Sequence, residues 1–87
     1  MRRGHALLSR EQHRRLSAAL FNHVWDLMEK KHRSSEEDVE MIRDAHASRF
    51  HWGEAGTPRN LAVGEWQIAR VYSLLNMPES ALYHAKR

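Results

Sequence analysis

The sequence predicts an all-α fold of four helices, arranged as two stacked antiparallel helical hairpins. The 87 residues include only four glycines and two prolines, so few positions can interrupt a helix. Ser9, Ser34 and Thr57 are residue types that begin helices. Between them, apolar residues recur at intervals of three, four and seven, which places them on one side of a helix. We expect one domain at residues 9–87, preceded by a basic tail at residues 1–8.

The first helix is expected at residues 10–32. Ser9 and Gln12 have the spacing of a capping box, in which each side chain binds the other residue's free backbone N–H group. The apolar residues that follow form two adjoining stripes, so this helix should pack against more than one neighbour. Trp25, with Phe21 beside it, is the best anchor for a second subunit, because large aromatic side chains dominate interface energetics. Ordinary core packing is the favoured alternative for these two residues.

The second helix is expected at residues 35–52. The positive charges at residues 30–33 should stabilise the C-terminal end of the helix before it, through the helix dipole. Ser34 and Glu37 form a second capping box. A glycine within residues 53–56 is expected to close the second helix in the left-handed conformation. The stripe predicted to face the core consists of Val39, Ile42, His46 and Phe50.

The third and fourth helices are expected at residues 58–76 and 78–87. Thr57 can cap the third helix, and Pro58 at its first position loses no hydrogen bond there. Asn76 should end it, because asparagine tolerates the left-handed conformation of a helix end. The connection is short, so the two helices must lie antiparallel and in contact.

The segment at residues 61–87 has small, aromatic and apolar residues at spacings that fit such a hairpin: Ile68-Ala69, Tyr72, Leu75-Asn76 and Ala81. This pattern resembles one tetratricopeptide repeat, which has a small residue after an aliphatic one, a tyrosine three positions later, a Leu-Gly pair and then an alanine. The resemblance implies a helical scaffold for protein interaction. Asn76 stands where that family has glycine, and Glu65 stands where it has a large apolar residue.

Glu65 is the most unusual residue, because it lies on the apolar stripe of its helix and a buried carboxylate is costly unless it is paired. The predicted polar cluster consists of His23, His46, Arg49 and Glu65, whereas His84 is among the histidines expected to be exposed. We favour a buried network that fixes helix register. The alternatives are a ligand pocket or peptide groove, and a catalytic or metal site in which His23, His46 and Glu65 supply two imidazoles and a carboxylate.

Composition excludes several other functions. Cysteine is absent, so neither disulfides nor thiolate metal sites can form, and a reducing compartment is allowed. The net charge is +3, but no glycine-rich phosphate loop or nucleic-acid motif accompanies the basic N-terminus, which disfavours nucleic-acid binding. No apolar run is long enough for a signal peptide or a membrane span. We expect a soluble, cytoplasmic protein without cofactor or metal.

The predicted function is non-catalytic protein–protein interaction or self-assembly. The short fourth helix should leave apolar side chains partly uncovered. Either the chain is a fragment of a longer helical-repeat protein, or two copies pair across this edge, and we expect at least a homodimer. The alternative is a small-molecule or metal-binding helical protein that uses the polar cluster. The residues predicted to form the interface are Phe21, Trp25, Trp52, Trp66, Leu82 and Tyr83.

Overall fold

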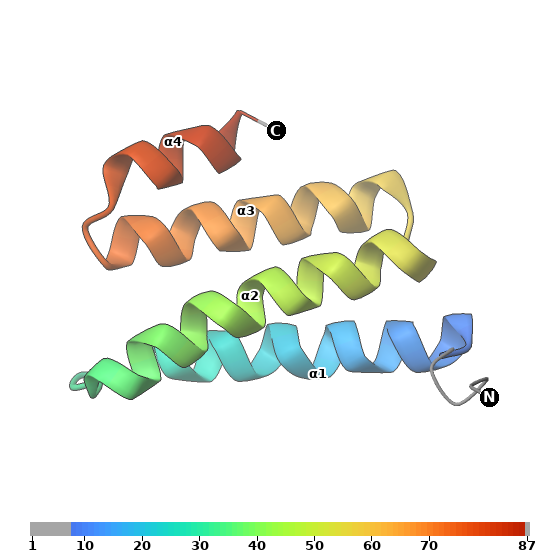
Figure 1. The fold of residues 1–87 in the computed structure, drawn as a ribbon, viewed down its shortest axis with the longest axis horizontal. Helices are drawn as coiled ribbons and strands as arrows, with labels where there is room; N and C mark the ends of the chain where they lie inside the picture. Colours follow the sequence, from blue (N-terminus) through green and yellow to red (C-terminus); the bar gives the residue numbers. More distant parts are fainter. Residues whose placement is uncertain (1–7, 87) are drawn as a thin grey trace, which may run out of the picture.

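The computed structural model describes residues 8–86, and most of the predicted basic tail, residues 1–7, lies outside the described part. Within residues 8–86 the chain forms helices and no strands, so the all-α prediction is confirmed. Figure 1 shows these helices as successive antiparallel rods. Their bounds are α1 Arg10–Met28, α2 Ser35–Ala55, α3 Pro58–Leu74 and α4 Pro78–Ala85.

The first three helices begin where the sequence predicts, because side chains satisfy their free N–H groups. The Ser9 hydroxyl accepts a hydrogen bond from the Gln12 backbone N–H at 3.1 Å, and the Gln12 side chain accepts one from the Ser9 N–H at 2.8 Å. Ser34 and Glu37 form the same reciprocal pair at 3.1 and 2.9 Å. Thr57 caps α3, with Pro58 at the first turn.

The end of α1 was predicted about one turn too late. The helix ends at Met28, and the basic run after it leaves the helical conformation. The guanidinium of Arg33 then turns back and donates from one nitrogen, Nη1, to the carbonyl oxygens of Leu27, Met28 and Lys30 at 3.2–3.4 Å. The run therefore stabilises the C-terminal end of α1, as expected, but Arg33 does so from the following loop.

The end of α2 was predicted too early, and the glycine mechanism proposed for it is wrong. The helix continues through Gly53 to Ala55. Gly56 then has an extended backbone, with φ of −93° and ψ of −177°, so no left-handed glycine closes the helix. By contrast, Asn76 after α3 does adopt the left-handed conformation, with φ of 62°. The N–H of Met77 reaches the carbonyl of Tyr72 at 2.8 Å, which is the bond expected at such a helix end.

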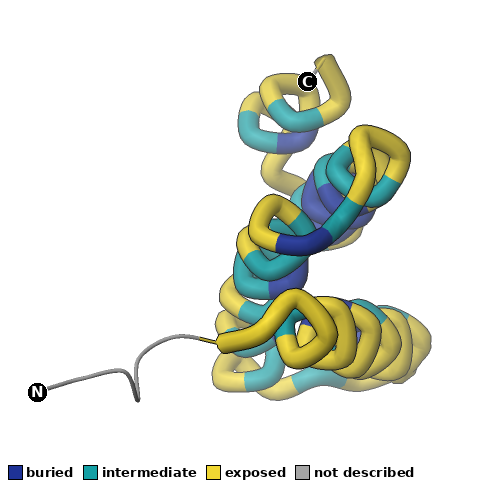
Figure 2. The backbone as a smooth tube through the Cα atoms, turned by 90° about the vertical axis from the view of Figure 1, so that its right-hand side faces the viewer, coloured by how far each residue is buried: buried dark blue, intermediate teal, exposed yellow. Residues whose placement is uncertain are grey.

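Each helix packs against the one before it in the chain. α1 lies along α2, α2 along α3, and α3 along α4, with a smaller contact between α1 and α3. The view turned by 90° shows these helices as a staggered stack in which buried positions lie between neighbours (Figure 2). The core consists of Val24, Leu27, Met41, Ala45, Ile68 and Val71.

The face of α2 that points into the core differs from the prediction. Val39 and Phe50 are exposed, and Ile42 and His46 are half-buried. The buried side is rotated toward smaller residues, because α2 must pack closely against α1 on one side and α3 on the other. Small side chains permit that approach. The residues of α2 that are buried are Met41, Ala45, Ser48 and Ala55.

Two buried serines mark the crossing of α1 and α2. Ser17 and Ser48 are fully buried, and each hydroxyl donates to the other residue's backbone carbonyl, at 3.1 and 2.9 Å. Each serine thus satisfies its own polar group while joining the two backbones. This pair fixes where the helices cross.

Candidate functional site

Glu65 forms the centre of a polar cluster between α2, α3 and α4. Its carboxylate accepts a hydrogen bond from Arg49 Nε on α2 at 2.9 Å, and its second oxygen lies 2.7 Å from His84 Nδ1 on α4. The Glu65 side chain is only 12% exposed. Burial raises the pKa of this carboxyl, but hydrogen bonds and charge from His84 and Arg49 outweigh it, so its pKa lies below the ordinary value.

The close approach of α2 to α3 positions Arg49 beside Glu65. Gly64 is buried, and a Cβ added there would lie 3.3 Å from the Arg49 Cα and 3.0 Å from its Cδ. A larger side chain at position 64 would therefore push the two helices apart. Because Gly64 has no side chain, α2 and α3 lie close enough for the Glu65 carboxylate to contact the Arg49 guanidinium.

A second set of contacts connects the same helices through aromatic rings. His46 Nε2 lies 2.9 Å from the Tyr72 hydroxyl. The His84 ring stacks on Tyr72 with centroids 5.6 Å apart and meets the His46 ring edge-on at 5.3 Å. Burial lowers the pKa of His46, the nearby His84 lowers it further, and Glu65 partly offsets the change. The two sets of contacts share His84 and join α2, α3 and α4.

The structure brings together three of the four residues predicted to form the polar cluster. Arg49 and Glu65 are directly paired, and His46 joins them through His84 and Tyr72. His23 lies apart from them, with its Nε2 2.5 Å from a carboxylate oxygen of Glu40. The hypothetical metal set of His23, His46 and Glu65 is therefore not assembled.

Sequence reasoning missed His84, which was expected to be exposed but is largely buried between Tyr72 and Glu65. The available signal was its position three residues after Ala81, which places it on the side of α4 that packs against α3. Its neighbour Tyr72 was considered as part of the repeat-like pattern, although its hydroxyl also needs a hydrogen-bond partner.

The residues predicted to form an interface fall into separate groups. Trp25 of α1 and Trp66 of α3 are both exposed and meet edge-to-face, with ring centroids 5.9 Å apart. The Arg70 guanidinium lies over the Trp66 ring at 5.6 Å. Phe21 is half-buried, and its backbone carbonyl accepts a hydrogen bond from the fully buried Gln67 at 3.0 Å. Trp52 is also half-buried, with its indole N–H inside the protein.

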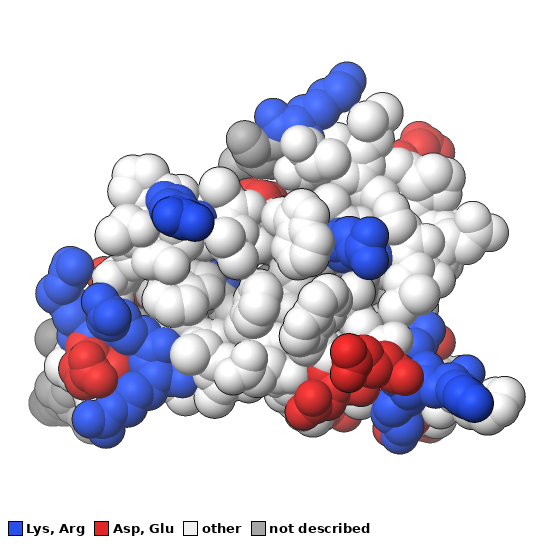
Figure 3. Space-filling view, turned by 180° about the vertical axis from the view of Figure 1, so that it is seen from behind, with Lys and Arg blue, Asp and Glu red and all other residues white. Residues whose placement is uncertain are grey.

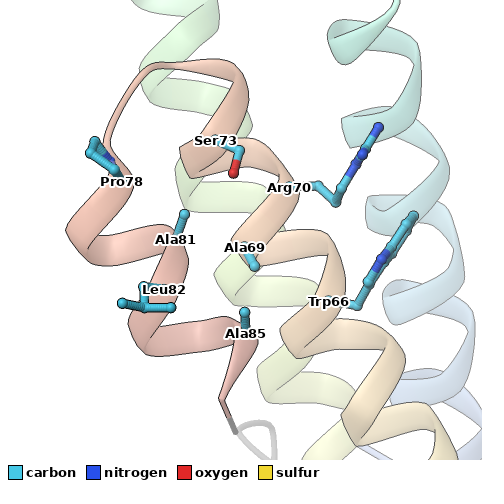
Figure 4. A pocket seen from close by; sticks show the side chains of 8 residues that line it. All are labelled: Trp66, Ala69, Arg70, Ser73, Pro78, Ala81, Leu82 and Ala85. Carbon is cyan, nitrogen blue, oxygen red and sulfur yellow. The ribbon is translucent and has the colours of Figure 1, made fainter.

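A groove runs between α3 and α4 beside Trp66. It has a volume of about 420 Å³ and is floored by small residues. Figure 4 shows side chains of the two helices lining it, with Leu82 at one side. Trp66 is 48% exposed and Leu82 is 56% exposed, which is high for large apolar side chains. Tyr83 on α4 is exposed as well and contacts the His84 ring. The lining residues are Trp66, Ala69, Arg70, Ser73, Pro78, Ala81, Leu82 and Ala85.

Charge is unevenly distributed over one face of the molecule. Seen from behind, the middle of the surface is mostly uncharged, with Lys and Arg or Asp and Glu side chains gathered toward the lower corners (Figure 3).

No helix within residues 8–86 combines the length and the apolar character required to cross a bilayer.

Comparison with known proteins gives no relative from which a role could be transferred. No family model matches the chain, and no curated protein or solved structure is significantly similar to it.

Proposed function

We propose that this protein is a non-catalytic interaction module of the helical-repeat type, which pairs with a second copy of itself or with another protein through α3 and α4. The observation that carries this proposal is the α3–α4 groove with Trp66 and Leu82 exposed beside it. Burying such side chains against a partner is favourable, because apolar area removed from water contributes about 25 cal/mol per Å². Arg70 and Trp66 belong to the residue types that most often dominate binding energy.

The order of packing supports a repeat-type scaffold. Each helix lies against its sequence neighbour, and α1 also contacts α3, so that the two hairpins stack in one direction. Among the described helices, α4 packs against α3 alone, so its other sides are not covered by a further helix. This arrangement fits the tetratricopeptide-like interpretation of residues 61–87.

The contacts within the polar cluster favour a structural role for these residues over a role in ligand binding. Both oxygens of Glu65 already have partners on α2 and α4, and the His46 ring has one in the Tyr72 hydroxyl. A network satisfied in this way fixes the relative positions of three helices. We therefore assign it to holding α4 in place, which in turn shapes the groove.

A small-molecule site at this cluster is the second candidate. One observation favours it: a hollow of about 310 Å³ beside Arg49 and Glu65, lined also by Pro58, Leu61 and Ala62. A ligand there would have to compete with the existing ion pair between these two side chains. We favour the interaction module, because the α3–α4 groove is exposed and a partner can bind there without breaking an ion pair.

Light scattering coupled to gel filtration at several protein concentrations tests the proposal. We expect the wild-type chain to form a dimer as concentration rises, and Leu82→Glu to remain monomeric because it places a charge beside the groove. Val39→Glu is the matched control, since Val39 is an equally exposed aliphatic residue on α2, outside the groove.

If the wild-type chain stays monomeric at every concentration, the self-assembly form of the proposal is refuted. In that case the protein-partner form of the proposal would be tested with wild-type and Leu82→Glu chains as paired baits. A partner retained equally by both would overturn the assignment of α3 and α4 as the binding surface.

A further inference from the structure

A group of metal-ligating side chains lies on the opposite helical hairpin, away from the α3–α4 groove. Glu40 and Asp44 are one turn apart on α2, and His23 faces them from α1. The His23 Nε2 atom is 2.5 Å from Glu40 Oε2 and 3.8 Å from Asp44 Oδ2. One ligand atom from each residue lies within 4.8 Å of the others. We propose that these three side chains form a binding site for a divalent transition-metal ion of the Zn²⁺ class.

The donor positions fit one ion after small side-chain rotations. Zinc holds nitrogen and carboxylate oxygen ligands at about 2.0–2.2 Å, so two ligands of a tetrahedral ion are about 3.3–3.6 Å apart. The distances from His23 to the two carboxylates lie on either side of that range. An ion placed between the three groups would lengthen the shorter distance and shorten the longer one.

The backbone beneath the site is held firmly, although the ligands themselves reach the surface. Each ligand is adjacent in sequence to a residue of the buried core, and the reciprocal serine bonds fix the same two helices nearby. The ligands are therefore presented from rigid elements, which favours a defined geometry. The adjacent core residues are Val24, Met41 and Ala45.

One carboxylate is already oriented by a neighbour. Arg43 Nε lies 3.4 Å from Asp44 Oδ1, while the other oxygen, Oδ2, faces His23. Side chains that contact a metal ligand commonly hold it in the orientation that binding needs. Asp44 is also the most buried of the three ligands, so its position is the most restricted.

The chemical types of the three ligand atoms indicate which metal ion the site would bind. An imidazole nitrogen with two carboxylates suits zinc and related first-row ions, whereas calcium requires six to eight oxygen ligands and magnesium keeps several waters. Three protein ligands leave a fourth position open to water or to an external ligand. The site is thus expected to bind Zn²⁺ and to discriminate against Mg²⁺ and Ca²⁺.

Calorimetric titration with zinc chloride alone as the probe tests this proposal. The full chain is used without an affinity tag, after a chelator has removed any bound metal. We expect one equivalent of Zn²⁺ to bind. Removing even a residue that only orients a ligand weakens metal binding about 10–100-fold, so His23→Ala and Asp44→Asn should each weaken binding by at least about tenfold.

The matched control is His13→Ala. His13 and His51 approach each other with Nδ1 atoms 2.8 Å apart, so they are a pair of imidazoles that would compete for zinc. Binding should be unchanged in His13→Ala, and circular dichroism should show all variants folded, because none of His13, His23 and Asp44 belongs to the buried core. The proposal is overturned if the wild-type chain binds no stoichiometric zinc, if His23→Ala binds as the wild type does, or if His13→Ala removes the binding.

Discussion

Replacing Glu65 by alanine should be among the most damaging single changes of a polar side chain on α3. The substitution removes the acceptor of two hydrogen bonds, one from Arg49 at 2.9 Å and one from His84 at 2.7 Å. Breaking a buried ion pair by deleting one partner costs about 3–5 kcal/mol. The Arg49 and His84 side chains are 28% and 16% exposed, so both can regain some hydration. We therefore expect a loss of about 2–4 kcal/mol in the free energy of unfolding, after discounting for that hydration.

Urea unfolding followed by circular dichroism measures this loss, and thermal unfolding should show a drop of about 10–25 °C in the melting temperature. A chain of this length has a total stability of only about 4–13 kcal/mol, so Glu65→Ala could leave little folded protein. Glu65→Gln is the milder variant. It keeps the shape and one carbonyl acceptor but loses the charge, and it should cost less than alanine does.

Glu11→Ala is the matched control. Glu11 pairs with Arg15 at 3.1 Å in an exposed position on α1, where an ion pair contributes about 0.3–0.5 kcal/mol. If Glu65→Ala costs no more than Glu11→Ala, then the polar cluster does not hold the three helices together, and the structural role assigned to it is wrong.

The Glu65 carboxylate also makes the difference in unfolding free energy between the wild-type and Glu65→Gln chains depend on pH. The pKa of Glu65 in the folded protein lies below its ordinary value of 4.5. Its contribution to stability is therefore fully present above that ordinary value and is lost as the pH falls through the lower, folded-state pKa. The difference in unfolding free energy between the wild-type and Glu65→Gln chains should therefore close in acid.

Three further predictions concern the positions that set the helix packing. Ser17→Ala removes one of two buried reciprocal hydrogen bonds with Ser48 and should cost about 1–3 kcal/mol, measured by urea unfolding; a cost near zero would mean that the pair is not needed. Asn76→Gly should be neutral or slightly stabilising, whereas a β-branched residue there should lower the melting temperature, because φ is 62°. Gly64→Val should destabilise by about 1–3 kcal/mol, since the α2 backbone lies 3.3 Å from an added Cβ, whereas Gly53→Ala, which meets only the end of a flexible side chain, should be tolerated.

The helix starts could be predicted because their causes are local. Ser9, Ser34 and Thr57 are each three residues before a side chain that completes the cap, and no distant contact is needed to recognise this. The left-handed turn at Asn76 was predictable for the same reason. Such features depend on a few neighbouring residues, so the linear sequence contains what is required.

The face of α2 and the membership of the polar cluster depend on the packing of several helices, so the sequence could not determine them. Val39 and Phe50 fit an apolar stripe, but the close crossing at Ser48 rotates α2 so that both point outward. Glu65 was recognised as a buried carboxylate, with His46 and Arg49 as its two candidate partners. The spacing of His84 from Ala81 indicates the side of α4 that packs against α3, but its contact with Glu65 depends on how α4 returns along α3.

The attachment of α4 has a consequence for the dynamics of the chain. Among the described helices α4 packs along α3 alone, and its link to α2 runs through the side chain of His84. Opening of α4 by itself would therefore expose much less apolar surface than opening of the whole molecule. Backbone amides of α4 should exchange with solvent deuterium well before those of α1 and α2, and any partner seated in the groove would slow that exchange selectively.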